Sequence, residues 1–191
     1  MKKVIAQRIE ESIEGLKCLL EDGKVQSAIM ETVNAMVSAI KRGNKIMMCG
    51  NGGSAADAQH VAGEFVCQFQ KKRSPLPAIA LSTDSSVMTA ISNDYSYDDV
   101  FARQVAAIGK PGDLLLAIST SGKSRNVLHA VKAANDKNIK TVLLTGAAET
   151  EITMLSDIVM NAPSSETPRI QEMHLIIEHL ICELVEKAFY E

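Results

Sequence analysis

The sequence is poor in the features on which nucleic-acid binding depends. It contains no tryptophan, and aromatic residues make up only 4% of its 191 residues, so bases would find few rings to stack on. Its 20 basic residues are outnumbered by 23 acidic ones, and the formal net charge of −3 offers no basic surface to a phosphate backbone. We therefore expect no nucleic-acid partner.

Long apolar runs and paired cysteines are also missing. No apolar stretch in the sequence approaches the roughly 18 residues of a membrane-spanning helix. The first apolar residues, Val4 to Ala6, are followed at once by polar ones, which is typical of a helix face and not of a signal peptide. The four cysteines have no C-x-x-C spacing, which indicates reduced thiols. These absences predict a cytoplasmic protein without a membrane partner.

The first part of the chain, residues 1–42, has the apolar periodicity of two helices. Apolar residues recur at spacings of three and four on both sides of a break at Asp22-Gly23. Two helices before the first strand cannot both connect strands, so their apolar faces are available to the sheet or to a partner chain. We expect this helical pair to contribute to the packing of an oligomer.

The remaining residues, 43–191, alternate short apolar runs with helical stretches. The runs typical of buried parallel strands are 45–49, 78–81, 114–118, 141–144 and 158–160. Helices are predicted at 54–70, 85–108 with a break near Asn93, 124–137, 149–155 and 168–188. This order predicts a single α/β domain over residues 1–191, with a doubly wound, five-stranded parallel sheet and a long C-terminal helix.

Two loops at the carboxyl ends of predicted strands, residues 50–54 and 119–124, are rich in small and hydroxylated residues. Ligands of open parallel sheets bind beyond these strand ends, and each loop opens a helix whose free N–H groups favour an anion. Serine and glycine are also ordinary turn residues, so either loop alone proves little. Two such loops in one sheet indicate a phosphate-binding site.

Candidate acid–base and metal-binding residues follow the first loop. His60 and Glu64 are four residues apart on a predicted helix, so they share a face. Such a pair can bind Zn²⁺ or transfer protons, although an isolated pair is more often an ordinary surface contact. Cys67 continues this face, and we expect it to be a buried thiol. Polar residues also interrupt the apolar stripe of the C-terminal helix; they are Gln171, Glu172, His174, Glu178 and His179.

These motifs in combination resemble the phosphoheptose isomerases. The similar segments are Gly50 to Ala56 with Gln59, His60 and Glu64, then Ser92 to Asp94, Ser119 to Ser124, and Arg169 to Glu172 with His174 and His179. The similarity covers essentially the whole chain in one register. It implies the sugar isomerase (SIS) fold, a flavodoxin-like sheet, and a homotetramer with sites at its subunit interfaces.

The resemblance also implies a role for each matching residue. Substrate and phosphate would be held by Asn51, Gly52, Gly53, Ser54, Glu64, Ser119, Thr120, Ser121, Ser124 and Gln171, and the sugar hydroxyls by Asn93 and Asp94. One Zn²⁺ per subunit would be bound by His60, Glu64, Gln171 and His179. Glu64 is the implied general base and His179 the general acid. Pro168 stands where some members have an acidic residue, and we attach no role to it.

The implied reaction converts sedoheptulose 7-phosphate to D-glycero-D-manno-heptose 7-phosphate through an enediolate, the first step toward ADP-heptose for the lipopolysaccharide core. Moving a proton between adjacent carbons requires a base, an acid and stabilisation of the enediolate. Glu64, His179 and Zn²⁺ would supply these. A carboxylate bound to zinc is a weaker base than a free one, so we expect Glu64 to bind the metal loosely.

On one regular helix, Gln171 and His179 are separated by about 12 Å of rise, which is difficult to reconcile with one shared metal. We therefore expect the neighbouring chain to supply at least one ligand.

Three other functions remain open at the level of sequence: a protein-binding scaffold of the SIS family, an isomerase of another sugar phosphate, and a sugar-phosphate sensor. Known scaffolds lack counterparts of Glu64 and His179, and a sensor would need no base at Glu64. The sequence leaves open whether Cys67 or His174 touches the site.

Overall fold

Five apolar runs form one sheet in the computed structural model, which describes residues 1–190. The strands are β1 (Ile46–Gly50), β2 (Ala78–Ala80), β3 (Leu114–Ser119), β4 (Lys140–Thr145) and β5 (Ile158–Asn161). Their order is β2-β1-β3-β4-β5, and every neighbouring pair is parallel. This flavodoxin-like order confirms the predicted fold class.

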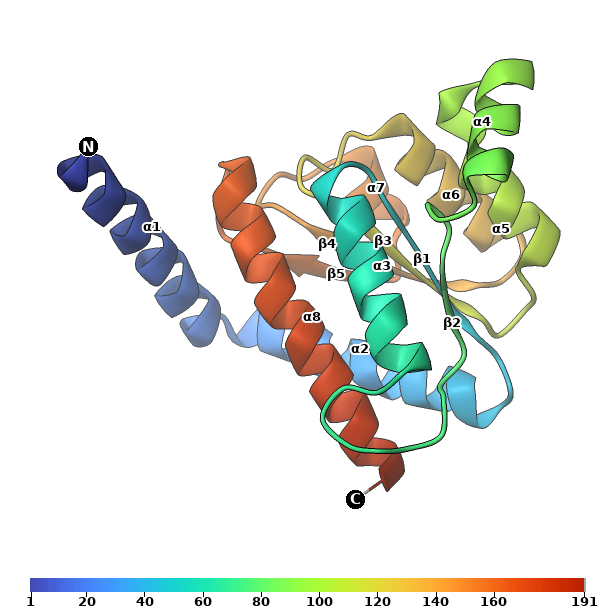
Figure 1. Ribbon diagram of the computed structural model, residues 1–191, viewed down its shortest axis with the longest axis horizontal. Helices are drawn as coiled ribbons and strands as arrows, with labels where there is room; N and C mark the ends of the chain where they lie inside the picture. Colours follow the sequence, from blue (N-terminus) through green and yellow to red (C-terminus); the bar gives the residue numbers. More distant parts are fainter. Residues whose placement is uncertain (191) are drawn as a thin grey trace.

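Helices cover both faces of the sheet (Figure 1). They are α1 (Lys2–Glu21), α2 (Gly23–Lys41), α3 (Gly53–Val66), α4 (Ser85–Asp94), α5 (Ala102–Ile108), α6 (Arg125–Asp136), α7 (Glu151–Leu155) and α8 (Thr167–Tyr190), with a 3₁₀ helix η1 (Tyr97–Asp99). The two N-terminal helices and the long C-terminal helix are therefore confirmed. Within residues 1–190, none of the helices combines the length and the apolar character that a membrane crossing demands.

Alternation along the strands divides the core into two apolar clusters, one on each face of the sheet. In β3, Leu114, Leu116 and Ile118 belong to the cluster that packs against α2, α3 and α8. Leu115 and Ala117 belong to the cluster that packs against α5 and α6. Successive side chains of a strand point to opposite faces, so a strand covered on both faces is apolar throughout. This explains why the sequence shows continuous apolar runs.

Helix α1 extends away from the sheet and touches α8 along part of its length (Figure 1). Only Leu19 of this helix is buried. Leu16 is partly buried against the core, and five further large apolar side chains are 47–73% exposed; they are Val4, Ile5, Ile9, Ile13 and Leu20. A stripe of this kind indicates an interaction surface.

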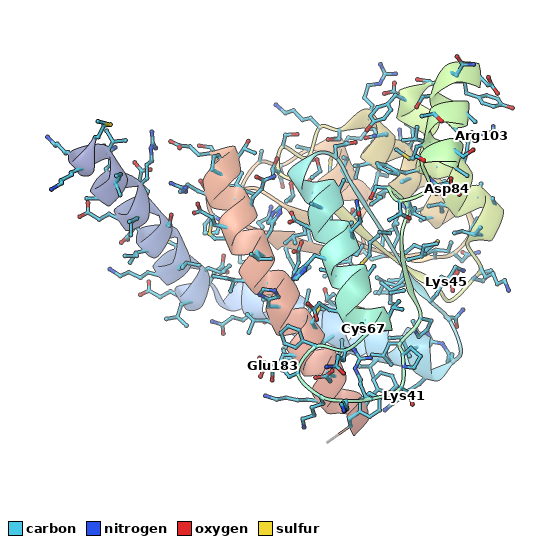
Figure 2. All side chains as sticks on the ribbon, in the orientation of Figure 1. Lys41, Lys45, Cys67, Asp84, Arg103 and Glu183 are labelled. Atoms are coloured by element: carbon cyan, nitrogen blue, oxygen red, sulfur yellow. The ribbon has the colours of Figure 1, made fainter. Side chains whose placement is uncertain are left out.

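Helix α3 ends at Val66, four residues before the predicted end, and the prediction of a buried Cys67 was wrong. Cys67 follows the last turn and is exposed; it is labelled at the end of α3 in Figure 2. The helix ends because Arg73 donates hydrogen bonds to the carbonyl oxygens of Glu64 and Phe65. The chain therefore turns toward α8 instead of continuing the helix.

Candidate functional site

The two predicted anion-binding loops lie next to each other at the switch point of the sheet. They follow the neighbouring strands β1 and β3, between which the strand order reverses. Ligands of doubly wound sheets bind outside the carboxyl ends of the strands at this point. The fold thus brings together two loops that are about 70 residues apart in the sequence.

The first loop is shaped by two glycines that open α3. Gly52 has a φ of +57°, a conformation that side-chain-bearing residues rarely adopt. A Cβ atom on Gly53 would lie 2.3 Å from Nε2 of Gln171, so only glycine allows this amide to approach. Ser54 is buried. Gln171 of α8 therefore lies directly beside the first turn of α3.

The second loop holds its hydroxyl groups between β3 and α6. The Oγ atoms of Ser119 and Ser124 are 3.2 Å apart, and the Thr145 hydroxyl donates to the carbonyl oxygen of Ser119 at 2.7 Å. Ser124 is the N-cap residue of α6, but its side chain makes no capping hydrogen bond. The N-terminal N–H groups of α6 are therefore not satisfied by that hydroxyl, as an anion-binding helix terminus requires.

The imidazoles of His60 and His179 lie close together, two turns of α3 beyond the first loop. The Nε2 atoms of His60 and His179 are 2.9 Å apart, and Nε2 of His60 is 3.8 Å from Oε1 of Glu64. The ring of Phe69 lies 5.7 Å from that of His179, centroid to centroid. The candidate general base Glu64 and the candidate general acid His179 therefore both lie against His60, with an aromatic ring beside His179.

The single chain brings only some of the predicted zinc ligands together. A tetrahedral Zn²⁺ would hold two imidazole nitrogens about 3.3 Å apart, close to the 2.9 Å between His60 and His179. Among residues 1–190, however, no three His, Cys, Asp or Glu side chains are close enough to hold a metal ion. Gln171 lies beside Gly53, whereas His179, on the same helix, lies beside His60. The expected separation of Gln171 and His179 is therefore seen.

Asn93 and Asp94 are exposed at the C-terminal end of α4, where the amide of Asn93 donates to Asp94 at 2.8 Å. They precede η1 by a connection of two residues, and the Tyr97 hydroxyl of η1 donates to Oδ1 of Asn51 at 3.1 Å. The segment therefore lies near the first loop. Tyr97 was not identified from the sequence, because a tyrosine in a short polar segment carries no distinctive pattern.

One buried and one partly buried carboxyl group, those of Glu178 and Asp57, lie on α8 and α3. Glu178 is fully buried, and neither of its carboxyl oxygens has a hydrogen-bond partner within residues 1–190. Burial, and secondarily the charge of Asp57, raises the pKa of Glu178 to about 8. Burial also raises the pKa of Asp57, against the opposing effect of His60. Glu178 is therefore protonated and uncharged at neutral pH.

His174 is a core residue in this structure. Its Nε2 lies 3.2 Å from the carbonyl oxygen of Thr145. Burial lowers its pKa to about 4, although the hydrogen bond with Thr145 acts in the opposite direction. The unfolded chain protonates this ring below about pH 6.5 and the folded chain does not. The stability contributed by His174 is therefore complete above pH 6.5 and is lost as the pH falls toward 4.

We expect His174→Gln to remove this pH dependence. Between pH 7 and pH 4 the free energy of unfolding of the native protein should fall by about 3 kcal/mol relative to the variant. Glu178 has the opposite pH dependence because its pKa is raised, and it is present in both proteins, so only their difference reports on His174. Urea denaturation at several pH values measures this difference. A difference independent of pH would contradict the prediction.

The fold and the site together define a SIS domain protein. The SIS domain family matches residues 13–146 of the chain, which include both loops, α3 and four of the five strands.

Similarity to known proteins identifies the family within this class to which the chain belongs. The phosphoheptose isomerase of Clostridium acetobutylicum is 46% identical over 190 residues, which cover 100% of this chain and 97% of the relative. That of Rhodospirillum rubrum is 47% identical over 171 residues, which cover 90% and 91%. The solved phosphoheptose isomerase of Neisseria gonorrhoeae matches with a TM-score of 0.91 at 38% identity, covering 97% of this chain and 98% of that chain. The chain belongs to the phosphoheptose isomerase family and is an isomerase.

Proposed function

We propose that the protein converts sedoheptulose 7-phosphate to D-glycero-D-manno-heptose 7-phosphate, in the cytoplasm, as the first step toward ADP-heptose for the lipopolysaccharide core. The observation that carries this proposal is the meeting of His60, Glu64 and His179 two turns from a pair of anion-binding loops. An acid–base pair beside a phosphate site is what aldose–ketose isomerisation requires.

The loops bind the two ends of the substrate differently. The hydroxyls of Ser119, Thr120, Ser121 and Ser124 and the N-terminus of α6 would hold the phosphate. Asn51, Gly52, Gly53, Ser54 and Gln171 would line the sugar chain, with Asn93 and Asp94 at its hydroxyl groups. Fixing the phosphate places the ketose end over Glu64 and His179, so that binding energy orients the reacting carbons.

Proton transfer would then proceed between two side chains. Glu64 removes a proton from C1 while His179 protonates the oxygen on C2, which gives the neutral enediol through an enediolate-like state. His179 next takes the proton from the oxygen on C1, and Glu64 returns its proton to C2. Each side chain ends in its starting protonation state, as a catalyst must.

We also propose that His60, Glu64, Gln171 and His179 bind one Zn²⁺ per subunit. When bound, the ion would stabilise negative charge on the two substrate oxygens as a Lewis acid. The 2.9 Å between the imidazole nitrogens supports this donor set. Glu64 shares a face of α3 with His60, and its Oε1 lies 3.8 Å from Nε2 of that imidazole. The separation of Gln171 from His179 supports a site completed by a neighbouring subunit.

A homotetramer would supply that neighbour. The exposed apolar stripe of α1, with Ile5 60% and Ile9 55% exposed, supports packing between chains. Light scattering of the purified protein tests this proposal, and a monomeric mass would contradict it.

The function is tested with sedoheptulose 7-phosphate followed by NMR, using the protein before and after metal removal. We expect conversion by the zinc-loaded protein, a rate at least about 100-fold lower after chelation, and recovery on adding Zn²⁺. Elemental analysis should give one zinc per chain for the native protein and much less for His60→Ala. A native protein that binds zinc but leaves this sugar unchanged would direct attention to other sugar phosphates. Loss of zinc without loss of rate would contradict the metal proposal alone.

A further inference from the structure

A network of side-chain amides and one phenol surrounds Asn51. Its Nδ2 donates to Oδ1 of Asn126 at 2.8 Å, and its Oδ1 accepts from Nδ2 of Asn126 at 2.8 Å. The Tyr97 hydroxyl lies 3.1 Å from the same Oδ1. Asn126 is only 3% exposed. Three segments that are distant in the sequence therefore meet at one amide.

The polarity of this network is fixed by one backbone group. The N–H of Val127, which can only donate, lies 3.0 Å from Oδ1 of Asn126. This contact fixes which end of the Asn126 amide is oxygen, and the reciprocal pair then fixes the Asn51 amide. Since Oδ1 of Asn51 is an acceptor, the Tyr97 hydroxyl must be the donor. Oδ1 of Asn51 thus receives two donors, and one N–H of its Nδ2 is committed to Asn126.

An ion pair and a hydrogen bond connect η1, which carries Tyr97, to α6. Arg125 of α6 lies 3.0 Å from Asp98, and His129 of α6 lies 3.1 Å from Asp99. Both acidic residues belong to η1, on which Tyr97 is the first residue. The 3₁₀ helix is therefore fastened to the same helix that carries Asn126, and the two donors to Asn51 are held by one element.

We infer that Asn126 and Tyr97 are positioning residues that orient Asn51 as a hydrogen-bond donor toward an oxygen of the sugar phosphate. Because one N–H of Asn51 bonds to Asn126, the second N–H is the group that can donate a hydrogen bond to a ligand. Oδ1 of Asn51 already accepts hydrogen bonds from Tyr97 and Asn126. The Asn51 side chain can therefore donate a hydrogen bond to a substrate oxygen but cannot accept one from a substrate hydroxyl. This inference rests on the proposed function, because it takes Asn51 to contact the substrate.

Tyr97→Phe isolates the network, since it removes one oxygen from a residue that is 53% exposed. We expect the KM for sedoheptulose 7-phosphate to rise about fivefold, with kcat changed less than about twofold, because one hydrogen bond to Asn51 is lost. Asn126→Asp, which keeps the acceptor and removes the donor to Asn51, should raise the KM at least as much. Tyr95→Phe is the matched control, because Tyr95 packs against Arg103 at the surface and should behave as the native protein.

A double-mutant cycle separates positioning from a general structural effect. If Tyr97 acts through Asn51, Tyr97→Phe should have no further effect on KM in an Asn51→Ala background. Additive effects, or a native KM for Tyr97→Phe, would overturn the inference. A native KM for Asn51→Ala would instead remove Asn51 from the substrate site and overturn it together with that part of the proposed function. If the native protein does not turn over this sugar, calorimetric binding of sedoheptulose 7-phosphate replaces KM in the same cycle, and absence of binding would overturn both.

Discussion

Glu64→Gln is expected to lower kcat for the isomerisation by about 1,000-fold, within the range that general acid–base groups contribute. The amide keeps the size of the carboxylate but cannot accept a proton from carbon. The backbone of this residue should be unaffected, because its carbonyl oxygen accepts a hydrogen bond from Arg73 whatever the side chain is. The thermal unfolding temperature should therefore stay close to that of the native protein.

Glu183→Gln is the matched control for this loss of rate. Glu183 lies on α8, the helix that carries His179, where it forms an exposed ion pair with Lys187 at 2.6 Å, and it is labelled in Figure 2. Its substitution should leave kcat within about twofold, because exposed pairs contribute little. NMR of product formation with both variants measures the contrast. If Glu64→Gln retained more than about a tenth of the native kcat, the general base would have to be another residue.

Arg73→Met is expected to cause the largest loss of stability, about 3–5 kcal/mol. Arg73 and Glu186 form an ion pair at 2.7 Å with side chains that are 2% and 3% exposed. Burial alone would raise the pKa of Glu186, but hydrogen bonds from the N–H of Gln70, from Arg73 and from two further backbone N–H groups together lower it. Glu186 is therefore a buried charge, and removing its cationic partner leaves it uncompensated. The carbonyl oxygens of Glu64 and Phe65 would lose donors as well.

Thermal unfolding followed by circular dichroism measures this loss. A protein of this size should show a melting temperature about 10 °C lower. Lys187→Met is the control, because it breaks the exposed pair with Glu183 and should cost less than about 1 kcal/mol. A double variant with Glu186→Leu added should recover part of the stability, since the unpaired charge is then absent. A melting temperature of Arg73→Met equal to that of the control would contradict a structural role for the buried pair.

The sheet was predictable from the sequence because strands covered on both faces appear as short, continuous apolar runs. The apolar runs that became β1, β3 and β4 are buried along most of their length, and apolar runs this short are typical of strands covered on both faces. The break of the helical stretch after Asp94 was also predictable, since Asn and Asp favour turns.

The end of α3 was not predictable from local sequence. The apolar and polar pattern continues past Val66. The helix ends where Arg73 donates to carbonyl oxygens of the last turn, and Arg73 is itself paired with Glu186, 113 positions away. Long-range ion pairs leave no periodic signal. The same reason hides Asn126 and Tyr97, whose partner Asn51 lies 75 and 46 positions away. The two loops were predictable from the residues alone, and Gln171 and His179 only through the family resemblance, whereas Asn126 and Tyr97 were not identified.

The parallel alignment of α3 and α8 has a consequence for how this chain can change in length over evolution. Gly53 lies opposite Gln171, and His60 lies opposite His179. Inserting one residue between Gly53 and His60 would turn the imidazole by about 100° around the helix and separate it from its neighbour. A deletion between Gln171 and His179 would have the same result. Insertions and deletions should therefore be rare within these two short stretches and should accumulate in the connections that lie outside them.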